Sequence, residues 1–338
     1  MKKLKIGLNG FGRIGRAFTR ILLDKDIAEI AAINTGKSTP EMLAYLLKYD
    51  SVYRKYEKDI SYGENFISIN GQKITTYNIK EPENIPWENH DVDVVIDCTG
   101  KFTDRENLQK HIKGSVKKVV LSAPSKDDSI LTVVMGVNDK AFDFKNTDII
   151  SNASCTTNCA APMFKILNEN LKIISGFLTT VHAYTATQEL LDNASKEFER
   201  SRAAAINTIP STTGAAKTVA KVVPELMGKI DGMAMRVPVP TGSITDISCL
   251  VEKNTTAEEI NSLFKMYSVN DDMKNILGYE TDVLVSSDYI KNPMSCIFDP
   301  NYTKVINGNF VKIFGWYDNE WGYSNRLVDV VERISQDY

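Results

Sequence analysis

The chain of 338 residues has few of the side chains that usually bind metals or form disulfide bonds. It contains three histidines, His90, His111 and His182, and five cysteines that form no CxxC pair. A structural zinc site needs about four ligands close together, so this scatter argues against one. An odd number of scattered cysteines likewise argues against a disulfide framework. We therefore expect neither a metal site nor a disulfide scaffold.

Long apolar runs and an excess of one charge are also missing. No apolar run approaches the ~20 residues that span a bilayer, and the net charge is −3. The N-terminal stretch MKKLKIGLNGFG has glycines and an asparagine where a signal peptide has an unbroken apolar segment. We expect a cytoplasmic protein whose main partner is neither a membrane nor a nucleic acid.

The order of the apolar segments predicts an α/β fold, and the length suffices for two domains. Short β-branched runs alternate with segments of helical periodicity, which favours a Rossmann-type, doubly wound sheet. The runs that we expect to be strands are 4–8, 27–33, 92–100, 117–125 and 131–138. After about residue 155 the runs lengthen, which is typical of a mixed or antiparallel sheet. We expect a dinucleotide-binding domain over 1–154, completed by a terminal helix within 319–338, and an α+β catalytic domain over 155–318.

The motif GFGRIG follows the first expected strand and opens a helix. Gly10, Gly12 and Gly15 fit the pattern G-x-G-x-x-G. In this context the first glycine permits a tight turn, the second lets the backbone approach a pyrophosphate, and the third permits close packing. The helix N-terminus then offers N–H groups to the phosphates. A glycine-rich turn without a ligand is the alternative.

The acidic residue that usually binds the adenosine ribose is missing. It is expected about 20 positions after the glycine motif, but no Asp or Glu occurs from 31 to 40. Thr35, Gly36 and Lys37 stand there instead. Either these residues form a plain surface turn, or they leave room for a 2′-phosphate that Lys37 attracts.

Cys155 lies among small side chains in SNASCTTNCAAP, just before a run that predicts a helix. A working cysteine needs a base or cation nearby, and His182 in VHAYTATQ is the obvious candidate. A helix N-terminus would also favour the thiolate. The alternatives are a small buried thiol and a histidine satisfied in the core.

Five stretches carry a resemblance to a known family. SNASCTTNC, VHAYTATQ, IPSTTGAAK, GMAMRVPVP and GWYDNEWGYSNR occur in order along the chain. They resemble the signatures of phosphorylating glyceraldehyde-3-phosphate dehydrogenases. The resemblance implies an oxidoreductase of glycolysis and gluconeogenesis that converts D-glyceraldehyde 3-phosphate, inorganic phosphate and NAD to 1,3-bisphosphoglycerate. It also implies a homotetramer with the loop from Tyr184 to Arg202 at subunit contacts.

The resemblance also implies roles for individual residues. Cys155 is expected to be the nucleophile that forms a thiohemiacetal and then a thioester, and His182 its acid–base partner. Substrate phosphate is expected at Thr185 and Arg236, and the attacking phosphate at Ser154, Thr156, Arg200, Thr213 and Gly214. The expected cofactor contacts are Asn9, Gly10, Phe11, Gly12, Arg13, Ile14, Asn34, Thr35, Ser122, Asn319 and Tyr323.

Two departures from the family pattern concern the cofactor. Most NAD-specific members have Asp where this chain has Thr35, and Leu-Pro where it has Asn193 and Ala194. Both changes favour use of NADP alongside NAD. The alternative activity is that of an erythrose-4-phosphate dehydrogenase, which uses the same cysteine chemistry but ends the thioester with water.

Overall fold

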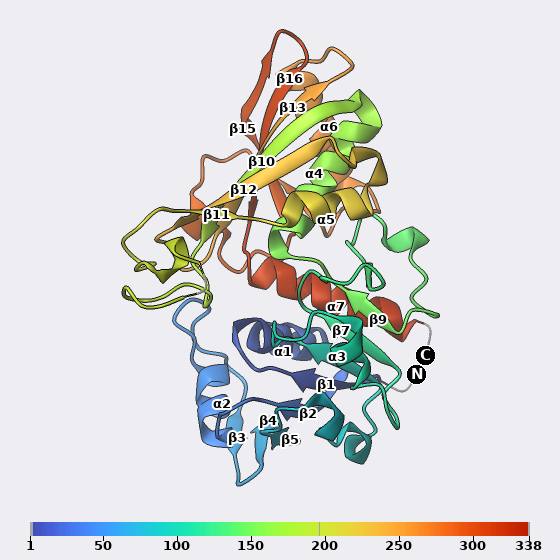
Figure 1. Cartoon of the computed structure of the whole chain (residues 1–338), viewed down its shortest axis with the longest axis vertical. Coiled ribbons are helices and arrows are strands. Elements are labelled where there is room, and N and C mark those ends of the chain that lie inside the picture. Colours follow the sequence, from blue (N-terminus) through green and yellow to red (C-terminus); the bar gives the residue numbers. More distant parts are fainter. Residues whose placement is uncertain (1–2, 196, 337–338) are drawn as a thin grey trace. The chain divides into compact units, whose positions relative to one another are not determined.

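The computed structural model describes residues 3–195 and 197–336 (Figure 1). The chain divides into two compact units. The first comprises Met1–Val133, Ala141–Ala153 and Ser324–Tyr338, and the second comprises Val134–Lys140 and Ser154–Tyr323. Each unit is built around one β-sheet. The last two residues of the expected terminal helix, 337 and 338, lie outside the described residues.

The first unit has a mostly parallel sheet with the strand order β3-β4-β5-β2-β1-β6-β7-β9-β8. Its core strands pair in parallel, and β3, β4 and β5 add an antiparallel extension. The strands are β1 (Lys5–Asn9), β2 (Glu29–Asn34), β3 (Ile60–Tyr62), β4 (Phe66–Ile69), β5 (Gln72–Tyr77), β6 (Val94–Asp97), β7 (Lys118–Leu121), β8 (Leu131–Thr132) and β9 (Ile149–Ser151). This is the doubly wound sheet that the sequence predicts.

The central strands of this sheet are buried along their whole length, as expected for parallel strands covered on both faces. Every residue of β6 and β7 is buried. Trp87 packs into the core cluster with Val95 and Val119. The α-helices of this unit are α1 (Arg13–Lys25), α2 (Pro40–Lys48), α3 (Arg105–Gln109) and most of α7 (Trp321–Ser335).

The second unit has a mostly antiparallel sheet with the order β11-β12-β10-β13-β16-β15-β14. Two strand pairs, β10 with β12 and β14 with β15, are parallel, so the sheet is mixed. The strands are β10 (Ile173–Ala183), β11 (Ile209–Thr212), β12 (Ile230–Val237), β13 (Ser243–Val251), β14 (Leu277–Tyr279), β15 (Cys296–Ile306) and β16 (Phe310–Tyr317). The predicted mixed or antiparallel second sheet is confirmed.

Helices cover one face of this second sheet. They are α4 (Cys155–Leu171), α5 (Ala215–Val222) and α6 (Ala257–Val269), which pack on the sheet in Figure 1. Along β13 buried and half-buried residues alternate strictly, as expected for a strand with one covered face. The uncovered face carries apolar side chains, among them Phe177 and Phe310 at 50% and 43% exposure. Short 3₁₀ helices lie at η1 (Pro82–Asn84), η2 (Trp87–His90), η3 (Asp139–Ala141), η4 (Glu199–Ser201), η5 (Pro224–Leu226) and η6 (Ser286–Tyr289).

One local prediction needs correction. The expected strand at 131–138 pairs only over Leu131–Thr132, because a turn follows in which Gly136 has φ of +79° and Val134 N donates to Asn138 Oδ1. In the second unit α5 ends before η5, since Pro224 cannot continue the α-helix.

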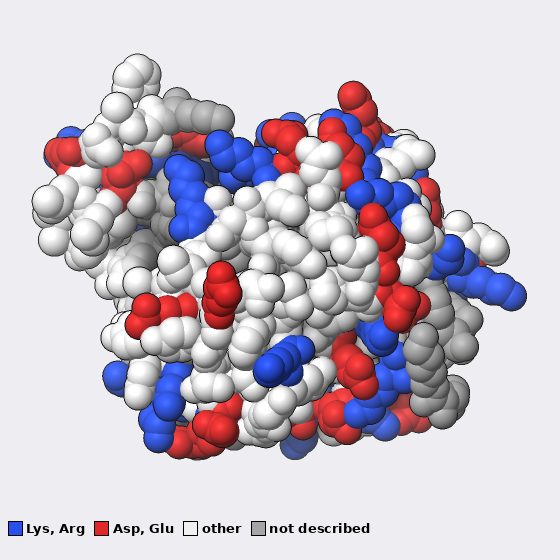
Figure 2. All heavy atoms as spheres, turned by 90° about the horizontal axis from the view of Figure 1, so that it is seen from below, with Lys and Arg blue, Asp and Glu red and all other residues white. Residues whose placement is uncertain are grey.

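Two further observations describe the surface. None of the helices within residues 3–195 and 197–336 is both long enough and apolar enough to span a bilayer. Figure 2 shows one face of the molecule, where acidic and basic side chains are interspersed around a broad uncharged area. On this face neither sign of charge forms a continuous field.

Candidate active site

The glycine loop of the first unit has a geometry that suits a phosphate group. Gly10 has φ of +97°, and a Cβ there would lie 2.8 Å from the backbone of Cys98. A Cβ on Gly15 would lie 2.3 Å from Gly10 O, whereas one on Gly12 would meet nothing within 4 Å. Gly12 is the N-cap of α1. The loop therefore combines a tight turn with exposed backbone at a helix N-terminus, where anions bind.

The asparagines at the ends of β1 and β2 are hydrogen-bonded to each other. Asn34 Nδ2 donates to Asn9 Oδ1 at 2.8 Å, and Asn9 Nδ2 donates to Asp97 Oδ2 at 2.8 Å. Asn34 also exchanges two hydrogen bonds with the backbone of Ile79. These side chains fix the spacing of the two strand ends, and the Asn34 amide has little capacity left for a ligand.

The remaining predicted cofactor residues of this unit lie around these strand ends. Thr35 is buried, and its hydroxyl donates to Asn78 Oδ1 at 2.6 Å, while Lys37 is exposed. Asn78 was not predicted, because nothing in the sequence distinguishes it from a turn residue. Arg13 forms an ion pair with Asp50 at 2.8 Å. Of the others, Phe11 is buried, Ile14 is half-buried, and Ser122 N donates to Asp97 O.

In the second unit, Cys155 is the first residue of α4. Ser154 caps the helix, with its Oγ accepting from Thr157 N at 3.1 Å. This local signal, a serine before a helical run, fixes where the helix begins. Cys155 Sγ lies 3.3 Å from Nε2 of His182, which comes from β10. The structure thus brings together the cysteine and histidine that the sequence separates by 27 positions.

Burial acts against a charge on either member of this pair. It raises the pKa of the Cys155 thiol, which the Arg236 guanidinium and the Thr156 backbone N–H lower in part. Burial and then the charge of Arg236 lower the pKa of His182. Either ion alone is therefore disfavoured, and the favourable route to a thiolate is transfer of the proton from Sγ to Nε2, which keeps the pair neutral overall.

Nδ1 of His182 has two neighbours that require opposite protonation states of this nitrogen. It lies 2.7 Å from Ala183 O, which can only accept a proton, and 2.7 Å from Arg236 Nη1, which can only donate one. With Nδ1 protonated toward Ala183, Nε2 carries a lone pair and can accept the thiol proton. With Nδ1 accepting from Arg236, Nε2 carries the proton instead.

Two arginines, Arg236 and Arg200, place positive charge near His182, and both lower its pKa. Arg200 donates from Nη1 to Thr187 Oγ1 at 3.0 Å and from Nη2 to Ser211 Oγ at 2.8 Å. Its Nε forms an ion pair with Glu197 at 2.8 Å. Thr185 joins this cluster, because its Oγ1 lies 2.8 Å from Thr187 Oγ1. Thr187 and Ser211 lie within the quoted motifs, but the sequence did not indicate that they hold Arg200.

The other predicted phosphate residues lie at helix starts. Gly214 is the N-cap of α5, and Thr213 Oγ1 accepts from Ala215 N at 3.2 Å. The hydroxyl of Thr156 is instead in a buried network, 3.0 Å from the hydroxyl of Tyr317. Tyr317, which we did not predict, also contacts Thr180 Oγ1 at 2.8 Å and lies edge-on to the ring of His182 at 6.0 Å.

Asn319 has a defined amide orientation. Its Oδ1 accepts from Thr241 Oγ1 at 3.2 Å, Gly242 N at 3.2 Å and Ser243 Oγ at 3.0 Å. The Gly242 N–H can only donate, so it identifies the accepting atom as oxygen. The Nδ2 amino group is therefore the end that Asn319 can offer to a ligand. Tyr323 is buried in the first turn of α7.

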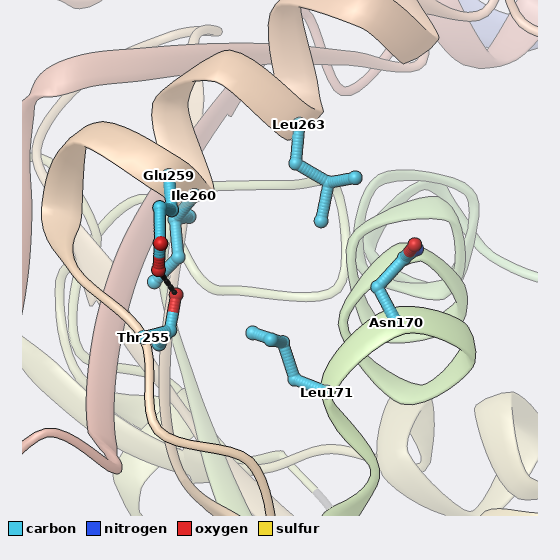
Figure 3. Close-up of a pocket in the computed structure, with 6 residues that line it drawn as sticks. All are labelled: Asn170, Leu171, Thr255, Glu259, Ile260 and Leu263. Carbon is cyan, nitrogen blue, oxygen red and sulfur yellow. Dashed lines mark hydrogen bonds between the residues drawn. The ribbon is translucent and has the colours of Figure 1, made fainter.

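A separate cavity of about 220 Å³ lies between the end of α4 and the start of α6 (Figure 3). Leu171 and Leu263 contribute its apolar lining, and Thr255 Oγ1 donates to Glu259 Oε2 at 3.1 Å on one side. None of the residues that line this cavity is a predicted site residue.

Comparisons with known proteins agree with the geometry of both units. Residues 4–105 match the family described as "Glyceraldehyde 3-phosphate dehydrogenase, NAD binding domain". Residues 154–319 match "Glyceraldehyde 3-phosphate dehydrogenase, C-terminal domain".

Similar proteins match over nearly their full length. Glyceraldehyde-3-phosphate dehydrogenase of Streptomyces coelicolor is 51% identical over 97% of each chain. Glyceraldehyde-3-phosphate dehydrogenase 2 of Bacillus subtilis is 45% identical over 98% of this chain and 97% of its own. Glyceraldehyde-3-phosphate dehydrogenase 2 of Synechocystis is 44% identical over 99% of each chain. With a family match in each unit and relatives that cover nearly its whole length, this chain belongs to the glyceraldehyde-3-phosphate dehydrogenase family.

Proposed function

We propose that this protein oxidises and phosphorylates D-glyceraldehyde 3-phosphate to 1,3-bisphosphoglycerate through a thioester on Cys155. The observation that carries the proposal is the part-buried contact of 3.3 Å between Cys155 Sγ and His182 Nε2 at the start of α4. A nucleophile within hydrogen-bond reach of a base is what acyl transfer through a thioester requires.

The residues of this chain fit a dinucleotide cofactor. Gly12 leaves open space where a pyrophosphate would approach the backbone, and the N-terminus of α1 offers N–H donors beside it. In the second unit, Asn319 presents an amino group that suits a carboxamide oxygen. When bound, NAD supplies the acceptor for the hydride.

Cys155 and His182 would carry out the covalent steps. The thiol passes its proton to His182 Nε2, and the thiolate attacks the aldehyde carbon. The imidazolium returns that proton to the new alkoxide, giving a thiohemiacetal. As the hydride leaves the carbon, His182 takes up the hydroxyl proton, and the carbon becomes a thioester. Inorganic phosphate then attacks the thioester carbonyl, and the Cys155 thiolate leaves.

The cationic groups suit two phosphate sites. Arg236 and Thr185 would hold the phosphate of the substrate, while Arg200, Thr213 and Gly214 would hold the attacking phosphate, with Ser154 and Thr156 at the start of α4. Arg200 is already oriented by Thr187 and Ser211. Arginine with hydroxyl donors is well matched to tetrahedral oxyanions.

The test is an assay of NADH formation from glyceraldehyde 3-phosphate with and without inorganic phosphate. We expect turnover that requires phosphate and that is lost in Cys155→Ser. Turnover that continues at the same rate without phosphate would contradict the proposal. Erythrose 4-phosphate in the same assay tests the alternative substrate, for which phosphate-independent turnover is the expected signature.

We also propose that the cofactor site accepts NADP alongside NAD. Thr35 brings no negative charge to the ribose, and its hydroxyl is engaged by Asn78. Lys37 is exposed two positions later and can attract a 2′-phosphate. At 193 and 194, exposed Asn and Ala replace the larger Leu-Pro pair of NAD-specific members. Comparison of kcat/KM for the two cofactors decides this proposal.

We further propose a cytoplasmic homotetramer. Leu190, Leu191 and Phe198 in the loop from 184 to 202 are 77%, 73% and 94% exposed, and the uncovered face of the second sheet carries exposed Phe177 and Phe310. Clustered apolar side chains of this kind usually mark protein interfaces. Analytical ultracentrifugation at micromolar concentration should give a tetramer, and a monomer would contradict the proposal.

A further inference from the structure

Arg236 makes a contact that phosphate binding alone does not require. Its Nη1 lies 2.7 Å from His182 Nδ1 and 3.2 Å from Ala183 O. These contacts place a permanent positive charge against the imidazole, on the side opposite Cys155. The guanidinium therefore opposes protonation of the residue that has to act as the base.

The charge of Arg236 is not neutralised by a neighbouring carboxylate. Within residues 3–195 and 197–336, no Asp or Glu forms an ion pair with it, and its buried Nε donates to no protein group. The charged or titratable groups that influence it most are Cys155 on α4, Arg200 on η4, Tyr317 on β16 and Glu197. A half-buried cation with a spare donor and no direct counter-ion is suited to receive an anion.

The same guanidinium therefore faces an anion site and the catalytic base. We propose that Arg236 couples anion binding to the basicity of His182: the guanidinium holds the imidazole neutral, and a dianion that pairs with the guanidinium allows the imidazole to accept a proton. The dianion neutralises the charge that opposes an imidazolium. It also competes for Nη1, which leaves His182 Nδ1 free to donate to Ala183 O and Nε2 free to accept from Cys155 Sγ.

This coupling gives the substrate phosphate a part in catalysis as well as in binding. A phosphorylated aldehyde would bring the dianion that makes His182 a competent base, and an aldehyde without a phosphate would not. The inference rests on the proposed function for the identity of that dianion. It does not depend on turnover, because the protonation of His182 can be measured without aldehyde or cofactor.

The experiment is a titration of His182 by NMR. The chain has only three histidines, so protein labelled with ¹³C at histidine Cε1 gives three resonances to assign. Cys155→Ser serves as the background because it removes the coupled thiol. Sulfate is the probe, since it stays a dianion across the titration, and chloride at equal ionic strength is its control.

We expect His182 to titrate well below its ordinary value of about 6.5 in chloride, and about one to three pH units higher in saturating sulfate. Adding Arg236→Gln should raise the midpoint pH of the His182 titration in chloride and abolish its shift on addition of sulfate. Arg202→Gln is the matched control, because this exposed arginine pairs with Asp192 at 2.8 Å and does not contact His182. It should leave both titrations unchanged.

Three results would overturn the inference. The first is a His182 titration that sulfate does not move, a result that needs no change at position 236 and so is decisive even if Arg236→Gln does not fold. The second is an Arg236→Gln titration equal to that of the background. The third is an equal response to sulfate in Arg236→Gln, which would show that the anion acts on the imidazole directly.

Discussion

Replacement of His182 by asparagine should separate the contribution of the imidazole to thiolate formation from the contribution of the Arg236 charge. Asparagine keeps a polar side chain of similar size but cannot take a proton from Cys155 Sγ, which lies 3.3 Å from Nε2. Because burial raises the pKa of the thiol, the thiolate then loses the imidazolium that compensates for its charge. Arg236 remains and still lowers the thiol pKa.

The size of the effect follows from these contacts. An opposite charge within 4–6 Å typically lowers a pKa by about 1–3, so alkylation of Cys155 by iodoacetamide at neutral pH should become ~10–1000-fold slower. The rate should recover as the pH rises toward the higher thiol pKa. Loss of the general base should reduce kcat/KM by ~10²–10⁴-fold, or about 3–5 kcal/mol in the activation barrier at 1.36 per decade.

The assay is the pH dependence of Cys155 alkylation in saturating sulfate, the dianion that allows His182 to accept the thiol proton, beside the pH dependence of NADH formation. His90→Asn is the matched control, because His90 contacts the Tyr77 hydroxyl in the first unit and not the cysteine. An alkylation profile in His182→Asn that matches the unsubstituted protein would refute the reasoning, since the imidazole would then make no difference to the thiolate.

Three further predictions concern other parts of the chain. Iodoacetamide should modify Cys155 stoichiometrically before Cys159, as peptide mass spectrometry would show, because Cys159 is fully buried; equal labelling would contradict the assigned nucleophile. Thr35→Asp should reduce kcat/KM with NADP far more than with NAD, since a carboxylate repels the 2′-phosphate; equal losses would show that position 35 does not face the ribose. Gly15→Ala should lower the free energy of unfolding by about 1–3 kcal/mol, because its Cβ would lie 2.3 Å from Gly10 O. Gly12→Ala, whose Cβ meets nothing within 4 Å, should leave stability in urea nearly unchanged and weaken NAD binding; the opposite order would contradict the assigned glycine roles.

The sequence predicted what local chemistry decides. A strand, a glycine turn and a helix start lie close together from Lys5 to Lys25, and within that segment a Cβ on Gly15 would meet Gly10 O. Ser154, a helix-capping residue before a helical run, likewise indicates the start of α4. The fold class followed from such segments, because alternation of strand and helix leaves few ways to bury both faces of a sheet.

The site residues that the sequence did not predict depend on contacts between segments far apart in the chain. Tyr317 contacts Thr156 across 161 positions, and Asn78 meets Thr35 across 43. Neither pairing leaves a periodic or spacing signal in the sequence. The contact between Arg236 and His182 is of the same kind, because it arises from the parallel pairing of β12 with β10, in which these two residues are register partners.

The hydrogen bonds to Asn319 Oδ1 decide which end of this amide can contact a ligand. A primary amide normally offers an acceptor and a donor, and can rotate to suit either kind of partner. Here the acceptor end accepts from Gly242 N and Ser243 Oγ, and from a Thr241 hydroxyl that is shared with Asp318 Oδ1, so rotation would set the amino group against the Gly242 N–H, which can only donate. Only the donor end remains available. In the cofactor site proposed above, a ligand carbonyl could accept from Asn319 Nδ2, whereas an N–H of the ligand would face a second donor. The orientation of Asn319 would therefore select the orientation of an amide ligand.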